Sequence, residues 1–443
     1  MRAISHLPRV RASAVLAVGL AGFAIYVISC VHSPVSWSPD SSKIALTVMP
    51  TDDDVEVMGI FTYDIDSGER RVIDTMTGEG ILSGPAWSPD GKWLAYYRVR
   101  PEEEGEGQTA GASAAGGGSG ERPAVSDLFT EDNRIQPAFV FAAGQDLLDE
   151  DPDAQTLDVE LVVVSADGKT RKAGRVLRWL GDKDTRSNVL VLRPRWSADS
   201  QRVFYMRTLD KMGYVGSLDI ATGRMEAHLF TSSTYWDVSP DGAWVAACLD
   251  DALALSRADG SAGRYLRVLT EEEAGEGDRP LAWAPDSRRV GVFLRTGFMV
   301  VDIETGAARR YRDATAEEIG HLTFAADGTK VYYVAKYRPE GGDEGEKAAA
   351  IRAMDLGSEK VETVTLLPEI DADADDGVGA FSVSPNGRMF LVRAVVPDDA
   401  GKKKSCLIFW DGRTRRVVET ESWLEPPAPK TGAADLSGTP AAS

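Results

Sequence analysis

The chain has 443 residues, of which 43% are hydrophobic, enough apolar material for a folded core. It contains 69 acidic and 49 basic residues, which gives a formal net charge of −20 at pH 7. This excess of negative charge argues against nucleic acid and anionic lipid surfaces as partners, because both would repel the protein.

The first 31 residues have the composition of an export signal or a membrane anchor. Arg2, Arg9 and Arg11 precede a stretch of twenty uncharged residues, 12–31. A basic start followed by an apolar stretch directs export, and about 20 apolar residues can also span a bilayer as a helix. We therefore expect residues 1–31 to be a signal peptide or an anchor, with the rest of the chain facing the periplasm or the cell exterior.

The sequence VISC, which ends at Cys30, resembles the lipobox of bacterial lipoproteins. The resemblance implies that the signal is cleaved before Cys30 and that the thiol of this residue carries lipid. Buried acyl chains would then hold the protein at a membrane. An uncleaved transmembrane helix and ordinary signal cleavage are the alternatives.

A hairpin motif recurs seven times between residues 34 and 424. Each copy starts with a large apolar residue, passes through a turn such as SPDG and ends in an apolar strand, as in WSPDGKWLAYY. Pro presets φ, Asp or Asn bonds its own backbone and Gly accepts a positive φ, so each copy is expected to be a β-hairpin. The acidic turn position is held by Asp40, Asp90, Asp199, Asp241, Asp286, Asp327 and, in the last copy, Asn386.

A second strand–turn–strand pattern follows every copy, for example FTYDIDSGERRVI from Phe61. The leading apolar residues of successive units lie 41 to 59 residues apart, except for one spacing of 109. Four short antiparallel strands at a period of roughly 40–50 residues are typical of a propeller blade. The sequence therefore predicts an all-β fold, a seven-bladed β-propeller of four-stranded antiparallel blades over residues 34–424, followed by a disordered tail over 425–443.

The long spacing contains an acidic, low-complexity insertion at 101–156, between the second and third strands of the second unit. Residues 101–160 hold 15 acidic and two basic residues, so they carry −13 of the total charge. The glycine-rich first part cannot bury enough apolar surface to order itself. Acidic loops at 50–56 and 338–347 occupy the same place in the first and sixth units, so all three should emerge from one face.

Residues with catalytic or metal-binding chemistry are few. No G-x-S-x-G motif occurs, and the residues outside the repeats are too few for a hydrolase domain. Among four histidines, only His321, expected just before the innermost strand of the sixth unit, would lie near the central channel. Asp371, Asp373 and Asp375 match a calcium loop only weakly, because an extra residue precedes the glycine and a serine stands at the twelfth position. We therefore expect no catalytic residue, no cofactor and no metal.

The remaining polar and thiol groups have structural interpretations. Because the turn aspartates recur in near-equivalent copies, we expect them to stabilise their own turns rather than to act in catalysis. Cys248 and Cys406 fall in strands of the fourth and seventh units, far apart around the ring, so both should be buried thiols and not a disulfide.

The WSPDG turn, followed by an apolar strand and a second hairpin, resembles the repeat of TolB-type β-propellers, which are relatives of the WD-repeat propellers. The resemblance covers nearly all of residues 34–424. It implies the fold but little about activity, because such propellers occur in envelope proteins and in prolyl-oligopeptidase-like enzymes. TolB itself has an α/β domain before a six-bladed propeller, so we do not expect this chain to be TolB.

Together these features favour a non-enzymatic, membrane-tethered propeller that binds an envelope protein or peptide as a monomer. Two alternatives belong to other classes. One is a glycan- or peptide-processing enzyme that uses carboxylates in the channel. The other is a propeller that binds a small ligand or calcium.

Replacing Cys30 by alanine should abolish incorporation of radiolabelled palmitate and prevent maturation by the lipoprotein route, because no thiol remains to carry the lipid. Metabolic labelling of cells that express the wild type or the Cys30→Ala variant measures this. Undiminished labelling of the variant would contradict lipidation at Cys30.

Overall fold

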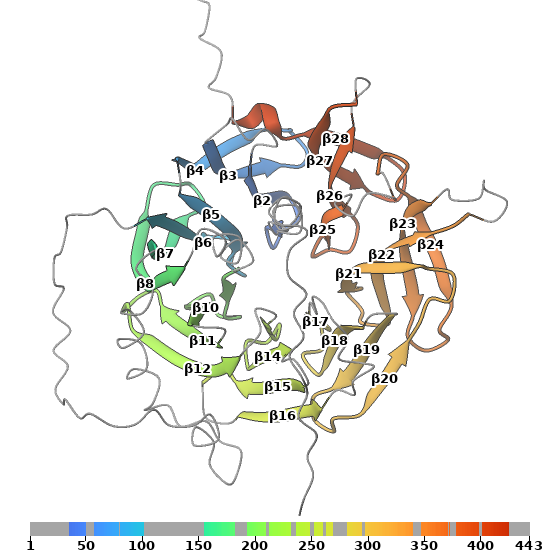
Figure 1. Cartoon of the computed structure of the whole chain (residues 1–443), viewed down its shortest axis with the longest axis horizontal. Coiled ribbons are helices and arrows are strands. Elements are labelled where there is room, and N and C mark those ends of the chain that lie inside the picture. Colours follow the sequence, from blue (N-terminus) through green and yellow to red (C-terminus); the bar gives the residue numbers. More distant parts are fainter. Residues whose placement is uncertain are drawn as a thin grey trace, which may run out of the picture.

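In a computed structural model, the described part of the chain forms 28 strands in seven four-stranded antiparallel sheets, arranged as blades around a ring (Figure 1). The predicted all-β, seven-bladed propeller is confirmed. Within the described ranges no helix is long and apolar enough to cross a membrane. The structure describes residues 35–49, 57–78, 80–101, 155–181, 193–209, 212–231, 236–248, 252–259, 263–268, 281–294, 297–339, 347–370, 372, 378–397 and 401–424.

Each blade consists of four strands that are consecutive in the chain and pair in that order. Blade 1 consists of β1 (Ser36–Trp37), β2 (Lys43–Val48), β3 (Val57–Asp64) and β4 (Arg70–Thr77), and blade 2 consists of β5 (Ile81–Trp87), β6 (Trp93–Pro101), β7 (Gln155–Ser165) and β8 (Arg171–Gly181). Blade 3 consists of β9 (Arg195–Trp196), β10 (Arg202–Leu209), β11 (Met212–Asp219) and β12 (Met225–Thr231), and blade 4 consists of β13 (Trp236–Val238), β14 (Trp244–Cys248), β15 (Ala252–Arg257) and β16 (Gly263–Val268). Blade 5 consists of β17 (Leu281–Trp283), β18 (Arg289–Leu294), β19 (Gly297–Asp302) and β20 (Ala308–Tyr311), and blade 6 consists of β21 (Glu318–Phe324), β22 (Lys330–Tyr337), β23 (Ala348–Asp355) and β24 (Val361–Leu366). Blade 7 consists of β25 (Val378–Val383), β26 (Phe390–Pro397), β27 (Lys403–Trp410) and β28 (Arg415–Glu419).

The antiparallel order sorts the connections onto two faces. Because successive strands reverse direction, the turns from strand 1 to 2 and from strand 3 to 4 of each blade lie at one end, and the connection from strand 2 to 3 lies at the other. We call the first end, which carries the seven repeat turns, the turn face. The acidic insertion connects β6 to β7 and therefore leaves from the opposite face. Residues 102–154 themselves lie outside the described residues.

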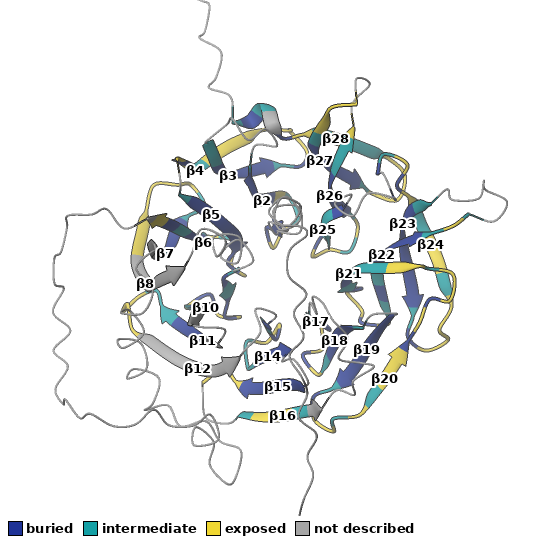
Figure 2. Cartoon of the chain, in the orientation of Figure 1, coloured by how far each residue is buried: buried dark blue, intermediate teal, exposed yellow. Residues whose placement is uncertain are grey.

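The hydrophobic core lies between blades. One cluster joins Ala45 and Ile60 of blade 1 to Leu94, Tyr96 and Val162 of blade 2. Comparable clusters join the other neighbouring blades around the ring. Figure 2 shows that buried residues gather on the inner strands, whereas outer strands such as β4 are largely exposed. Each sheet is therefore stabilised by its neighbours on both sides.

The ring closes by side-chain packing between the first and last blades. Among the described strands, none of blade 7 pairs with the sheet of blade 1. Instead, Phe61 and Tyr63 of blade 1 pack in one buried cluster with Phe409 of blade 7. The Trp37 indole N–H donates to the Ser382 hydroxyl across the same boundary, at 3.0 Å. Closure thus depends on side chains rather than on a shared strand.

A short 3-10 helix after the last strand, η4 (Glu421–Trp423), completes this closure. The Trp423 side chain is only 6% exposed, and its ring centroid lies 5.3 Å from that of Tyr63 and 5.6 Å from that of Phe61. The Thr420 hydroxyl, just before η4, donates to the Ser405 carbonyl at 3.0 Å and fixes the segment to blade 7. Trp423 therefore joins the end of blade 7 to blade 1.

Replacing Trp423 by alanine should lower the free energy of unfolding by about 3–5 kcal/mol, because a buried aromatic side chain is lost and a cavity remains. Trp423→Phe, which keeps an aromatic ring against Tyr63, should lose less. Equilibrium unfolding in urea measures both variants. An unchanged transition midpoint for Trp423→Ala would show that the ring does not depend on this contact.

Candidate functional site

Each of the seven repeat turns is held by hydrogen bonds to its own acidic position, whose Oδ1 accepts a main-chain N–H two residues later. In blade 2, the Ser88 hydroxyl donates to Oδ1 of Asp90 at 2.7 Å and accepts the main-chain N–H of Trp93 at 2.9 Å. Gly91 then takes a positive φ of 72°, as its lack of a side chain permits.

Asn386 forms the same turn without a charge. Its Oδ1 accepts the Ser384 hydroxyl at 2.8 Å and the N–H of Arg388 at 3.0 Å. The turn therefore requires an oxygen acceptor at this position but no negative charge. The other six turns have aspartate at this position. Each therefore adds a negative charge to the turn face that is not needed to form the turn.

Hydrogen bonding keeps the carboxylates of Asp40 and Asp199 ionised. The Ser38 hydroxyl is the main cause that lowers the pKa of Asp40 below its ordinary value, and the Ser197 hydroxyl does the same for Asp199. A hydrogen bond donated to a carboxylate favours its charged form. Both side chains are therefore negative throughout the neutral pH range.

Three turns have serine with a positive φ where the others have glycine. The φ angles are 64° at Ser41, 59° at Ser200 and 56° at Ser287, a conformation that costs a residue with a Cβ roughly 1–2 kcal/mol. Each serine hydroxyl offsets part of this cost because it accepts a main-chain N–H from the turn of the preceding blade. The donors are, in the same order, Asn386 at 3.1 Å, Asp90 at 3.0 Å and Asp241 at 2.9 Å. The sequence carries a signal for this contact, the serine that replaces the turn glycine in SPDS, SADS and APDS.

The glycine turns also contact their neighbours closely. A Cβ added at Gly242 would lie 2.9 Å from the main-chain nitrogen of Ala198 in blade 3, so glycine is required by the approach as well as by its φ of 70°. At Gly91, an added Cβ would lie 3.6 Å from Cδ of Pro39 in blade 1. The turn face is thus built from turns that touch from blade to blade.

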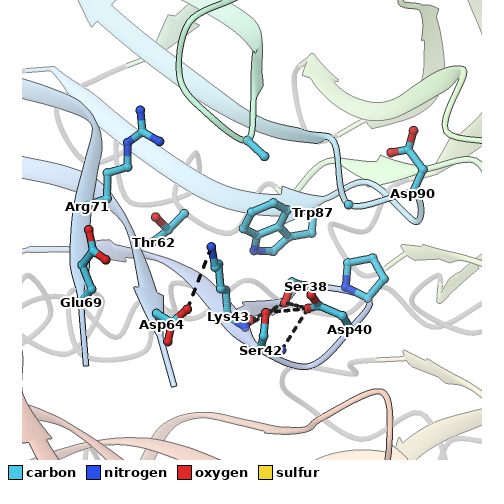
Figure 3. Close-up of a pocket in the computed structure, with 13 residues that line it drawn as sticks. Ser38, Asp40, Ser42, Lys43, Thr62, Asp64, Glu69, Arg71, Trp87 and Asp90 are labelled. Carbon is cyan, nitrogen blue, oxygen red and sulfur yellow. Dashed lines mark hydrogen bonds and ion pairs between the residues drawn. The ribbon is translucent and has the colours of Figure 1, made fainter. Parts of the chain in front are cut away.

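A pocket of about 370 Å³ opens on the turn face between blades 1 and 2. Blade 1 contributes its repeat turn with Asp40 and, from its strands, Lys43 and Thr62. Blade 2 contributes Trp87 and the turn with Asp90. Figure 3 shows these side chains around the pocket and their origin in two adjacent blades. The pocket is therefore a feature of the blade boundary and not of a single repeat.

The pocket has more acidic than basic groups. Its lining includes four carboxylates, those of Asp40, Asp64, Glu69 and Asp90, and two cations, Lys43 and Arg71. The Lys43 ammonium lies 4.0 Å from Oδ2 of Asp64, and the Arg71 guanidinium donates to the main-chain carbonyl of Asp167. The walls are thus highly charged, with a net negative charge.

Trp87 differs from two of its counterparts in the repeat. The indole N–H groups of Trp37 and Trp196 donate across a blade boundary, to the Ser382 hydroxyl and the Ala86 carbonyl, each at 3.0 Å. Trp87 is 9% exposed, and its Nε1 has no hydrogen-bond partner among the described residues. A buried N–H without an acceptor costs about 1–3 kcal/mol relative to a bonded one.

A second polar cluster, between blades 5 and 6, is occupied by internal bonds. The Asp313 carboxylate accepts the Tyr333 hydroxyl at 3.0 Å and the Arg352 guanidinium at 2.6 Å. Burial, reinforced by the Asp313 charge, raises the pKa of Tyr333. Asp74 makes a similar joint between blades 1 and 2, where it accepts the Tyr96 hydroxyl at 2.8 Å. These clusters hold neighbouring elements together by internal bonds, although the buried Nε of Arg352 has no hydrogen-bond partner among the described residues.

Other residues singled out in the sequence do not form a site in the described part of the chain. His321 lies inside β21, not before it, because a bulge between Gly320 and Thr323 extends the strand upstream. Its Nε2 lies 3.3 Å from the Val378 carbonyl, and burial lowers its pKa, so the ring is neutral. The described residues contain no group of three or more His, Cys, Asp or Glu that could hold a metal ion.

Cys248 and Cys406 are buried in blades 4 and 7 and form no disulfide, as expected. Cys30, the aspartates at 371, 373 and 375, residues 102–154 of the insertion and the tail at 425–443 lie outside the described residues. Pro101 and residues 155–156, which the insertion was expected to include, belong to β6 and β7.

The comparisons with known proteins concern the fold. No family model matches the chain, and no curated protein matches it. A chain in the crystal structure of a mitotic checkpoint complex is similar over 86% of this chain and 87% of its own, with 11% identity and a TM-score of 0.51. TolB from Acinetobacter baumannii is similar over 86% of this chain and 80% of its own, with 15% identity and a TM-score of 0.40. An oligogalacturonate lyase in complex with manganese covers 84% of this chain and 86% of its own, with 14% identity and a TM-score of 0.49. A propeller fold by itself does not assign an activity.

The stability of the propeller should depend on pH through its turn aspartates. A lowered pKa stabilises the fold fully above the unfolded value of about 3.9, and this contribution is lost as the pH falls through the folded pKa. The turn aspartates with a lowered pKa are Asp40, Asp90, Asp199, Asp286 and Asp327. The melting temperature should therefore be level from about pH 7 to 5 and decrease below about pH 4. Asp199→Asn should weaken this decrease, because the variant keeps the turn, as Asn386 does, but loses one titrating group. A variant with the same profile as the wild type would contradict the assignment.

Proposed function

We propose that this protein is a non-enzymatic propeller that binds a protein or peptide through its turn face. The observation that carries the proposal is the pocket between blades 1 and 2, whose volume of about 370 Å³ falls in the range of ligand-binding sites. Its walls combine carboxylates, basic groups and an indole. This mixture suits the polar main chain and the charged side chains of a peptide.

The positions of the pocket walls support binding. Asp40 and Asp90 are each fixed through Oδ1 by a serine of their own turn, at 2.6 and 2.7 Å. The two turns also approach each other through Pro39 and Gly91. A site whose groups are already in place loses less conformational entropy when a ligand binds.

We further propose that the propeller works outside the cytoplasmic membrane, held there by lipid on Cys30 or by an uncleaved helix. This part of the proposal rests on the basic and apolar composition of residues 1–31. A partner in that compartment would be another envelope protein or a peptide. The net charge of −20 favours a partner with a basic surface, because complementary charge accelerates association.

Peptide binding can be tested with the full chain, purified in detergent, on an array of random dodecamers. We expect a reproducible set of bound peptides that compete in solution. Ala166→Phe should abolish binding, because the ring would occupy the pocket. Ala173→Phe is the matched control, since it fills a neighbouring pocket between blades 2 and 3. An array that binds nothing would contradict the proposal.

A further inference from the structure

We infer that the pocket between blades 1 and 2 receives a lysine or arginine side chain of a bound peptide, while the Trp87 indole N–H donates to a main-chain carbonyl of the same peptide. The inference rests on the proposed peptide-binding function and specifies its ligand chemistry. It combines two independent observations, the open carboxylate oxygens of the pocket and the buried, unpartnered indole beside them.

The charges in the pocket favour a cation. Four carboxylates face two cationic side chains in the lining. One of the two cations, Arg71, already donates to the Asp167 carbonyl, and the other, Lys43, lies 4.0 Å from Asp64. A third cation, Lys92, lies outside the lining and 3.5 Å from Oδ2 of Asp90. Four carboxylates thus face three cations, and an incoming ammonium or guanidinium group would still meet a net negative charge.

Two of the carboxylates have an oxygen to offer. Oδ1 of Asp40 accepts the Ser38 hydroxyl at 2.6 Å and the N–H of Ser42 at 3.0 Å, and Oδ1 of Asp64 accepts the N–H of Ser67 at 2.9 Å. Within the described residues, no hydrogen bond is made by Oδ2 of Asp40, and Oδ2 of Asp64 has only the distant Lys43. Both second oxygens can accept charge-assisted hydrogen bonds without breaking a turn.

The Trp87 indole N–H needs a hydrogen-bond acceptor, which the main chain of a bound peptide could provide. In Figure 3 it lies among the side chains of the pocket, with its nitrogen on the side of Ser38 and Lys43. Ser36 of blade 1 holds the position that Ser382 holds for Trp37, and so could have accepted the Trp87 indole N–H. Its hydroxyl instead accepts the main-chain N–H of Trp87 at 2.9 Å. A peptide carbonyl would provide the acceptor that the protein lacks at this position.

A metal ion fits the pocket less well than a basic side chain. Lys43 and Arg71 stand in its walls, and the described residues form no group of three acidic or metal-ligating side chains close enough to coordinate one ion. Lysine and arginine have long apolar stems that can lie along Thr62, Trp87 and Ala166 while their charged ends reach the carboxylates.

The test uses the full chain labelled with 15N at its tryptophan indoles and purified in detergent. The probes are acetyl-Gly-Ser-X-Ser-Gly-amide peptides in which X is arginine, lysine, glutamate or citrulline, the uncharged analogue of arginine. Trp87→Phe and Trp283→Phe assign the two indole signals. Trp283 is the internal control, because it has the same repeat position and an unpartnered Nε1 but does not line this pocket.

We expect the arginine and lysine peptides to move the Trp87 indole N–H signal downfield and to leave that of Trp283 in place. Citrulline and glutamate peptides should bind at least about tenfold more weakly, as expected for loss of a charged hydrogen-bond partner. An unmoved Trp87 signal at saturation, or equal binding of the citrulline peptide, would overturn the inference.

Two double variants test whether the carboxylates of Asp40 and Asp64 bind the basic side chain. Asp40→Asn with Asp64→Asn should weaken the arginine peptide at least about tenfold, whereas Asp199→Asn with Asp219→Asn, the same positions in blade 3, should not. Asp199 and Asp219 hold their turns through the same kinds of bonds, so both pairs should fold equally. Equal loss in both pairs would overturn the inference. If other peptides bind on the array while basic ones do not, the inference fails and the proposed function stands; if none binds, both fail.

Discussion

The propeller depends on the fact that each sheet is apolar on both faces along its inner strands, so no blade is stable without a neighbour on each side. The ring must therefore close, and the contact between blades 7 and 1 is the one that chain connectivity does not provide. Here Tyr63, Phe409 and Trp423 close it by packing. This contact fixes blade 1 and, with it, one wall of the pocket that blade 1 shares with blade 2.

The candidate site lies within a scaffold whose turns are nearly identical. The turns repeat the same hydrogen bonds seven times, and even Asn386 preserves them. At the leading position of the repeat, the indoles of Trp37 and Trp196 have a cross-blade acceptor, whereas those of Trp87 and Trp283 have none among the described residues. Trp87, unlike Trp283, lines the pocket between blades 1 and 2. The repeated turns thus provide a rigid scaffold, and the proposed binding chemistry comes from a blade boundary where an unpartnered indole lies beside several carboxylates.

The fold was predictable from the sequence because the signal of each blade is local. An apolar residue, the acidic turn and the following strand, as in Trp87 to Tyr97, all lie within a dozen residues. The closing contact was not predictable, because Trp37 and Ser382 are 345 residues apart and Trp423 follows the last repeat. The pocket was missed for a related reason, since it is space left between two blades, and only packing determines how much space remains.

The two sides of the closing contact are also made at very different times during synthesis, because they lie far apart in the sequence. At about 5–20 residues per second, the 345 residues that separate Trp37 from Ser382 take tens of seconds to make. For that time the side of blade 1 with Ile44 and Leu46, which blade 7 finally covers, has no partner. A transiently exposed apolar face of this kind makes a nascent chain prone to aggregation. The nascent protein is therefore most vulnerable to aggregation before its last blade emerges, and a chaperone that shields blade 1 in this interval would raise its yield.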